Sequence, residues 1–397
     1  MTSATSPGDD ATRYGARIAG LIRSGWTELW RPAPGNVAAL DGARSLAVLL
    51  VIASHVGVAW QQAKLPRIAA LKLPVFYFGW TGVDLFFVLS GFLIGGQLWR
   101  ELDRTNDVAF GRFFLRRGFR IWPLYYFHLA FLTVFASYYV PTWPDWLLVS
   151  NYFPHGYTRG WSLSTEEHFY LVAPPLALLL FRYARQWVVP ALLLTLAAVA
   201  LMRFGASEAL LAEGRTISDV KTKLYDPFHL HCEGLVVGLI IAYLRRELPQ
   251  RLRSSVDRFG VARRSLLIMV VLVVLGGALR ALNGVLFPFL ALGLIYGGLL
   301  WWLLDDRSFA SAPFRWRGWH LIARLSFGMY LNHLIWPHIG PSLVTSAVSL
   351  VGENAGALVL ATVGAVAVSV SVAAVTFVTI EYPFLRLRDR VLSHKPA

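Results

Sequence analysis

Long apolar stretches recur along almost the whole chain, and short polar segments rich in arginine separate them. Each stretch is close to the ~20 residues that a helix needs to cross a hydrocarbon core. The pattern therefore predicts an all-α polytopic membrane protein, a bundle of about ten transmembrane helices. The expected spans are Leu40–Trp60, Phe76–Trp99, Ile121–Val140, Glu166–Phe181, Trp187–Phe204, Phe228–Leu244, Leu266–Leu282, Leu286–Leu304, Leu321–Ile339 and Ala357–Ile380.

Positive charge is distributed unevenly between the two sets of connecting loops. Of the 37 Lys and Arg residues, 27 lie in tails and loops assigned to one side, nine lie in the alternate loops, among them Arg203, and Arg44 lies inside the first span. The positive-inside rule places the arginine-rich side and both termini in the cytoplasm. The expected organisation is a cytoplasmic tail over 1–35, a transmembrane domain over 36–390 and a second cytoplasmic tail over 391–397.

Composition limits the partners. Hydrophobic residues make up 56% of the chain and charged residues only 15%, while the formal net charge is +14. Because the arginines lie in short loops between apolar runs, membrane topology explains this charge, and we expect a lipid bilayer and no nucleic acid as a partner.

The amino-terminal tail carries an amphipathic pattern. Between Arg13 and Trp30, apolar residues such as Ile18, Ile22 and Trp26 recur at helical spacing, and arginines lie off that stripe. The pattern predicts a helix in the cytoplasmic membrane interface. An amphipathic helix packed on the bundle explains it equally well.

The first span contains three polar residues on one helical face. Eleven helical steps bring His55 back within roughly 20° of Arg44, and Asp41 lies one turn before Arg44. His55 falls about 16 Å deeper than Arg44, near the middle of a hydrocarbon core about 30 Å thick. An ionisable side chain at that depth is a functional-site candidate, although a histidine can also serve as a polar contact between packed helices.

The second and third spans add a carboxylate and an arginine cluster. Small residues in GWTGVDLFFVLSGFLIGG, from Gly79 to Gly96, permit close helix packing, and Asp84 is buried near the outer end. Four arginines crowd the cytoplasmic start of the third span: Arg112, Arg116, Arg117 and Arg120. Arginine binds phosphate bidentately, so the cluster indicates an anionic ligand, and topology anchoring explains it about equally well.

Carboxylates and histidines also occur in later spans. Glu166 and Glu167 open the fourth span, where a helix N-terminus favours negative charge and Ser164 is a candidate cap. In the ninth span, His333 lies nine residues past Arg324 and so again near mid-depth. Two histidines at similar depth are harder to explain as packing contacts than one.

The start of the sixth span, DPFHLHCEG, offers candidate metal ligands. Asp226, His229 and Glu233 are expected to share a helical face. No compact ligand motif accompanies them, so no metal is expected.

Taken together, these segments resemble those of the acyltransferase-3 family of integral membrane O-acyltransferases. The matching segments follow the family order along the whole chain: Asp41-Gly42-x-Arg44 with His55, VDLFFVLSGFLI (Val83 to Ile94), RIWPLYY (Arg120 to Tyr126), WSLSTEEHFYL (Trp161 to Leu171), MYLNHLIWP (Met329 to Pro337) and EYPF (Glu381 to Phe384). The chain departs from the family at His168, where glutamine is usual, and at Asn332, where an aromatic residue is frequent. No hydrolase-like domain follows the last span, unlike in fused members, so we expect the membrane domain to act alone or with a separate partner.

The resemblance implies transfer of an acyl group, commonly acetyl from acetyl-CoA, to a hydroxyl of a glycan, lipid-linked sugar or small molecule in the bacterial cytoplasmic membrane. Acyl transfer to a hydroxyl needs a base with a pKa near neutrality, which histidine supplies. The expected catalytic residues are His55, Arg44, Asp41, Glu166 and His333. Acyl-CoA would bind to Arg112, Arg116, Arg117, Arg120 and Tyr125.

In this scheme Arg44 positions the donor or polarises its carbonyl, and Asp41 orients Arg44. Glu166 orients the acceptor or His55. A covalent acyl-histidine is an alternative course of the reaction. The competing class of function is a transporter or flippase with a proton relay through Asp84, His55 and Glu166. The sequence contains no paired half-repeats with broken helices that would favour it.

Overall fold

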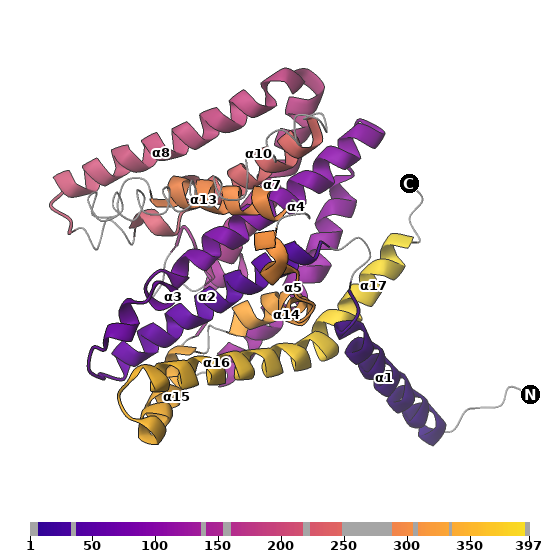
Figure 1. The fold of residues 1–397 in the computed structure, drawn as a ribbon. Coiled ribbons are helices and arrows are strands. Elements are labelled where there is room, and N and C mark those ends of the chain that lie inside the picture. Colours follow the sequence, from indigo (N-terminus) through magenta and orange to yellow (C-terminus); the bar gives the residue numbers. More distant parts are fainter. Residues whose placement is uncertain are drawn as a thin grey trace, which may run out of the picture.

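The computed structural model describes residues 7–32, 37–135, 140–153, 160–216, 223–247, 288–304, 309–332 and 336–393. As predicted, the regular structure of these residues is helical (Figure 1). The helices are α1 Pro7–Leu29, α2 Ala38–Gln62, α3 Pro74–Tyr77, α4 Gly82–Thr105, α5 Phe110–Phe135, α6 Trp143–Trp146, α7 Trp161–Tyr183, α8 Val188–Ala212, α10 Glu233–Glu247, α13 Pro288–Leu303, α14 Trp319–Asn332, α15 Trp336–Val351, α16 Ala355–Thr376 and α17 Tyr382–Ser393.

Four of the described helical segments are long and apolar enough to cross a membrane: Ala38–Gln62, Gly79–Thr105, Arg185–Ala212 and Ala355–Ser393. They correspond to the predicted first, second, fifth and last spans. The count of ten spans and the side of the termini stay predictions, and the predicted seventh span lies outside the described residues.

Helix α2 lies at the centre of the bundle. It contacts α4, α14, α15 and α16, and in Figure 1 α8 and α16 lie on opposite flanks of the α2–α4 pair. Small side chains permit this position: Ala43 and Ala47 are fully buried, and a Cβ on Gly42 would lie 2.3 Å from the carbonyl oxygen of Phe314. Polar side chains on α2 are thereby held among several helices rather than on an outer face.

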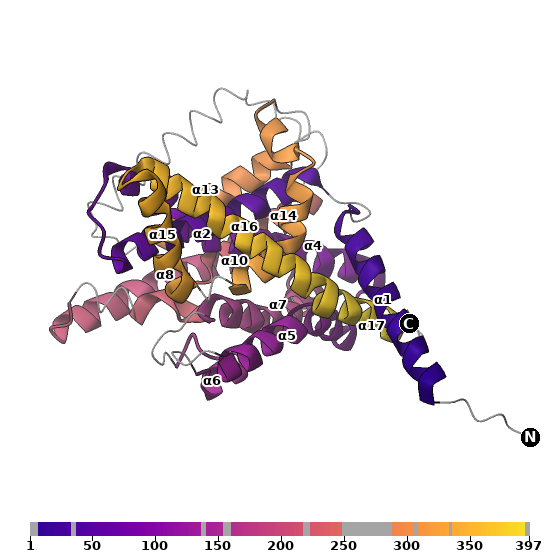
Figure 2. The same cartoon turned by 90° about the horizontal axis from the view of Figure 1, so that it is seen from below.

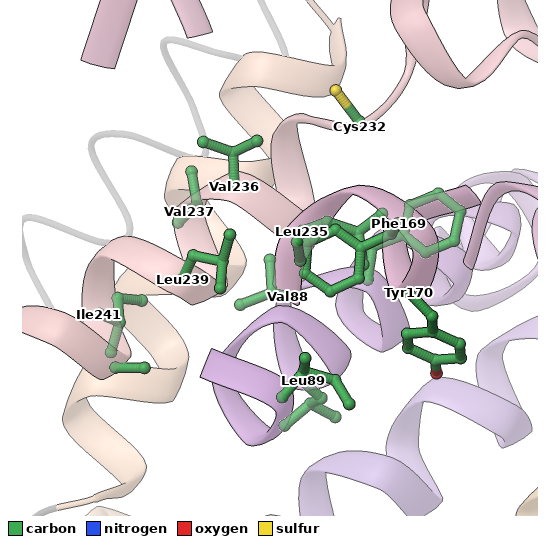
Figure 3. Close-up of a cluster of buried hydrophobic side chains, with 14 of the residues drawn as sticks. Val88, Leu89, Phe169, Tyr170, Cys232, Leu235, Val236, Val237, Leu239 and Ile241 are labelled. Carbon is green, nitrogen blue, oxygen red and sulfur yellow. The ribbon is translucent and has the colours of Figure 1, made fainter. Parts of the chain in front are cut away.

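Helices α4 and α10 pack closely against each other. A Cβ on Gly91 of α4 would lie 2.0 Å from the carbonyl oxygen of Leu235, and one on Gly238 of α10 would lie 2.3 Å from that of Val88. Figure 3 shows Val88 beside Leu235 in the apolar cluster that joins α4, α10 and α7. The small residues of the second predicted span therefore permit close packing, as expected.

Two predicted spans differ from the observed helices. The ninth, Leu321–Ile339, includes the last residues of α14 and the first of α15, and residues 333–335 between them lie outside the described residues. The fifth, Trp187–Phe204, continues to Ala212 in the structure. Arg203, which the charge count placed with the outer loops although it falls within that predicted span, is buried.

The last span continues without interruption from α16 through a π-helical turn, Phe377–Glu381, into α17. The amphipathic helix of the tail is confirmed as α1, which projects from the body beside α17 (Figures 1 and 2). Its last residue, Leu29, is buried in the bundle, while Ile18, Ile22 and Trp26 are about half exposed. Contact of that stripe with a membrane stays a prediction.

Candidate active site

A cavity of about 120 Å³ lies between five helices of the bundle, and we call it the inner cavity. Most of its apolar lining residues come from α4, and most of its polar lining residues come from the other helices. The polar lining residues are Arg44 of α2, Ser90 of α4, Arg117 and Arg120 of α5, Ser162, Glu166 and Tyr170 of α7, and Ser326 and Tyr330 of α14. Four of the predicted functional residues thus line one space: Arg44 from α2, Arg117 and Arg120 from α5, and Glu166 from α7.

Glu166 reaches this cavity because of where α7 begins. The helix starts at Trp161, so Glu166 lies in its second turn rather than at its N-terminus. Ser164 is buried and shares a hydrogen bond of 3.0 Å with Ser150 instead of capping the helix. The helix-terminus interpretation of Glu166 and Ser164 is therefore wrong.

A chain of hydrogen bonds fixes the Glu166 carboxylate. The hydroxyl of Tyr170 donates to Glu166 Oε2 at 3.3 Å, and Ser90 Oγ lies 3.2 Å from the same hydroxyl. Because the single phenolic proton is given to Glu166, Ser90 is the donor to Tyr170. The guanidinium of Arg117 lies 5.4 Å from the Tyr170 ring centroid, within cation–π range.

Positive charge surrounds this carboxylate. The guanidinium groups of Arg117 and Arg44 both lie close enough to act electrostatically on Glu166.

One turn before Arg44, Asp41 Oδ2 lies 3.2 Å from His320 Nδ1, and the other ring nitrogen of His320 lies 2.9 Å from the carbonyl oxygen of Arg31. Both ring nitrogens face oxygen acceptors, so His320 donates from each or shares one proton with Asp41. His320 was not singled out in the sequence because it lies 279 residues from Asp41.

A second hollow of about 810 Å³ adjoins the inner cavity, and we call it the arginine chamber. The two share Leu93, Arg44, Arg117 and Arg120 in their linings. Eight arginines and one glutamate line the chamber: Arg44, Arg100, Arg104, Arg112, Arg116, Arg117, Arg120, Arg388 and Glu101.

All four arginines predicted to act as a group line the chamber. The sequence did not identify Arg100 and Arg104, one turn apart at the end of α4, or Arg388 of α17 as members of the same site. Their helical spacing was visible, but their approach to α5 depends on the tertiary fold.

The remaining predicted residues lie elsewhere. His55 is half-buried on α2, its Nδ1 lies 2.8 Å from the carbonyl oxygen of Val51, and it lines neither the inner cavity nor the chamber. The hydroxyl of Tyr125 donates to the carbonyl oxygen of Asp145 at 2.7 Å, away from both hollows. His333 lies outside the described residues.

Two buried pairs lie apart from the cavities. His231 Nε2 lies 3.0 Å from Asp84 Oδ1, and its ring stacks on Phe289 at 3.6 Å. Arg203 pairs with Glu233 and covers the Phe289 ring at 4.6 Å. Asp84 thus has a histidine partner on another segment.

The candidate metal ligands of the sixth span do not share a helical face. Phe228–Leu230 forms a 3-10 turn and α10 begins only at Glu233, so no single helix includes Asp226, His229 and Glu233. His229 stacks on Tyr152. In the described ranges no three histidine, cysteine or acidic side chains lie close enough to hold a metal ion.

Comparison with known proteins identifies a family that the chain matches. A family model described as an acyltransferase domain matches residues 37–376. The peptidoglycan O-acetyltransferase OatA of Listeria monocytogenes is 28% identical over 174 residues, which are 38% of this chain and 25% of that protein. The O-acetyltransferase OatA of Staphylococcus aureus is 26% identical over 272 residues, 61% of this chain and 41% of that protein. The chain therefore matches less than half the length of these relatives. No solved structure matches it.

Proposed function

Because the chain belongs to the acyltransferase-3 family and is an acyltransferase, we propose that it moves an acetyl group from acetyl-CoA to a hydroxyl group of a glycan or a smaller acceptor. It does so as an integral protein of the bacterial cytoplasmic membrane. The names of its relatives in Listeria and Staphylococcus support acetyl transfer to oxygen.

One observation carries the proposal: the arginine chamber adjoins the inner cavity at Arg44, Arg117 and Arg120. CoA joins a polyanionic nucleotide to a long uncharged arm that ends in the thioester. A basic hollow beside a small, mostly apolar one matches these two parts, because arginine forks hold phosphate and a cavity of about 120 Å³ suits a short acyl group.

The reaction needs a proton acceptor and stabilisation of an oxyanion. A base removes the hydroxyl proton of the acceptor, and its oxygen attacks the thioester carbonyl carbon. The C–S bond then breaks, CoA leaves as the thiolate, and the proton passes to its sulfur. The new ester retains the acyl group.

The proposed roles follow the positions of the groups. Arg44 and Arg117 lie in the inner cavity, where a guanidinium would stabilise the charge that develops on the carbonyl oxygen. Glu166 holds the acceptor hydroxyl, and Tyr170 fixes the orientation of Glu166. Asp41 and its partner His320 orient the segment that carries Arg44.

We assign proton removal to His55. When Nδ1 donates to the Val51 carbonyl, Nε2 is the nitrogen that accepts a proton, which is the form that a general base needs. Catalytic contacts commonly tighten only when substrate binds, so its place outside the cavity lining is compatible with this role. His333 and Tyr125 keep their sequence-based assignments as proposals.

The acceptor we favour is a carbohydrate hydroxyl, because the Listeria relative is named for peptidoglycan. A lipid-linked sugar or a small-molecule acceptor is the alternative. A proton-driven transporter would need a relay through Asp84, His55 and Glu166. Asp84 pairs with His231 and lines neither hollow, so no observation favours this alternative.

The test uses detergent-purified full-length protein and acetyl-labelled acetyl-CoA. We expect release of free CoA thiol that depends on the protein, with label transferred to soluble peptidoglycan fragments. Absence of both CoA release and labelled ester, with protein that binds CoA, would refute acyl transfer. Label on a small-molecule acceptor alone would correct only the acceptor.

A further inference from the structure

The eight arginines of the chamber fall into two groups by position. Arg44, Arg117 and Arg120 also line the inner cavity, and we call them the neck arginines. The distal arginines line the chamber alone: Arg100, Arg104, Arg112, Arg116 and Arg388. A donor with its thioester in the inner cavity therefore meets the neck arginines first and the distal arginines last.

We propose that the distal arginines form a binding site for the 3′-phosphorylated nucleotide of CoA, so that the protein accepts only donors with that group. This inference rests on the proposed function for its orientation, since the thioester must occupy the inner cavity. Beyond that function, it specifies which part of the donor the protein recognises and which residues recognise it.

The distal arginines come from separate parts of the chain. Arg100 and Arg104 end α4, Arg112 and Arg116 begin α5, and Arg388 lies on α17 at the far end of the sequence. The two α4 residues are exposed, as is Arg116. Convergence of three helices on one hollow distinguishes this set from a row of charges on a single solvated helix face.

Most of these positive charges have no counterion in the part of the chain that the structure describes. Within the described ranges, Arg100, Arg104, Arg112 and Arg116 have no hydrogen bond or ion pair. Arg388 pairs only with its neighbour Asp389, at 2.7 Å. The single carboxylate in the lining, Glu101, accepts a hydrogen bond from the backbone N–H of Ala109. Like charges gathered without counterions repel one another, and a polyanion relieves that repulsion.

The chemistry of the donor identifies the anion. In CoA the diphosphate lies between the pantetheine arm and the ribose, and the 3′-phosphate is the phosphate furthest along the chain from the thioester. A phosphate monoester carries a charge of about −1.5 to −2 near neutral pH. Acyl groups on carrier proteins hang from phosphopantetheine without a nucleotide, so a site for the 3′-phosphate excludes them as good donors.

The test compares two ligands that differ only in this phosphate. Binding of CoA and of dephospho-CoA to the purified full chain is measured by calorimetry at fixed ionic strength. Because hydrogen bonds to charged groups are the strong ones, we expect wild-type protein to bind CoA about 10- to 100-fold more tightly. Equal affinity for the two ligands would overturn the proposal.

A double variant, Arg100→Gln with Arg104→Gln, locates the site. It should weaken CoA binding and leave dephospho-CoA binding nearly unchanged, so that the ratio of affinities falls to within about threefold. Arg388→Gln, on another helix, should lower the same ratio if the α4 variant fails to fold. Arg67→Gln, which removes an equal exposed charge outside the chamber, is the matched control and should keep the wild-type ratio.

The outcomes separate this inference from the proposed function. Equal weakening of both ligands in the α4 variant would mean that these arginines act only as a general positive field, which overturns the 3′-phosphate site. Acetyl transfer with no preference for CoA over dephospho-CoA would refute the inference and leave the proposed function intact. A clear preference for CoA over dephospho-CoA without acetyl transfer would refute the proposed function and leave the 3′-phosphate site intact.

Discussion

Tyr170 lies one turn after Glu166 on α7, and its hydroxyl donates a hydrogen bond to the Glu166 carboxylate at 3.3 Å. This contact holds a carboxylate within the inner cavity, beside Arg117 and Arg44. The Glu166 carboxylate lies among several guanidinium groups rather than in one dedicated ion pair. It can therefore accept a hydrogen bond from an incoming hydroxyl.

Glu166→Gln should lower acetyl transfer by about 100-fold or more, because a neutral amide oxygen accepts a hydrogen bond from the acceptor hydroxyl much more weakly than a carboxylate does. The measurement is turnover of acetyl-CoA at saturating acceptor. Glu167→Gln is the matched control, since Glu167 is the next residue and lines neither hollow, and it should stay within about threefold of wild type. Equal loss in the two variants would assign the effect to helix packing.

His55→Ala should abolish transfer and leave expression and membrane insertion near normal. Removal of a polar ring from a membrane-depth helix does not hinder insertion, whereas loss of the base stops the reaction. His168→Gln is the control, because it also removes a histidine and restores the residue usual in the family. Wild-type turnover in His55→Ala protein would show that His55 is a packing residue.

The sequence predicted the gathering of Arg112, Arg116, Arg117 and Arg120, and it singled out Arg44 and Glu166 as functional candidates. It also placed His55 on the same helical face as Arg44, but His55 lines neither hollow. Hydropathy places segments in the membrane, and helical periodicity places side chains on faces, so both are local properties of the chain.

The contacts between distant segments were not readable from the sequence. Arg203 and Glu233 pair across 30 residues, Asp41 meets His320 across 279, and Arg388 reaches the chamber from the last helix. Each depends on how whole helices pack, which periodicity within one helix does not determine. For that reason the sequence did not indicate that Arg203 is buried against Glu233.

Neutralising Arg116, Arg117 and Arg120 together should weaken binding of acetyl-CoA, since charge-assisted contacts to phosphate are strong. The difference from wild type should shrink as salt rises, because screening already weakens exposed charge pairs in the wild type. Binding is measured at several ionic strengths on correctly inserted protein. Unchanged affinity together with inverted insertion would make these residues topology signals only.

Glu233→Gln should destabilise the fold by about 3 to 5 kcal/mol, because it leaves Arg203 buried without a counterion. Both side chains are 0% exposed. Thermal unfolding in detergent measures the change. The exposed pair Arg185–Glu247 is the control: Glu247→Gln should cost about 1 kcal/mol or less. Equal shifts in the two variants would contradict the structural importance of the buried pair.

The proposed mechanism requires that the sulfur of CoA enter the inner cavity, which Ser90 lines. In a background with Cys232→Ala, which removes the single native cysteine, the Ser90→Cys variant is exposed to CoA disulfide and its mass is measured. Attack by its thiolate releases one CoA thiol and leaves a mixed disulfide. We expect one CoA adduct at this position, prevented by acetyl-CoA, and none in Ser207→Cys, which is buried on α8 and lines neither hollow. A Ser90→Cys variant that stays unmodified when folded, yet reacts fully when denatured, would contradict this mechanism.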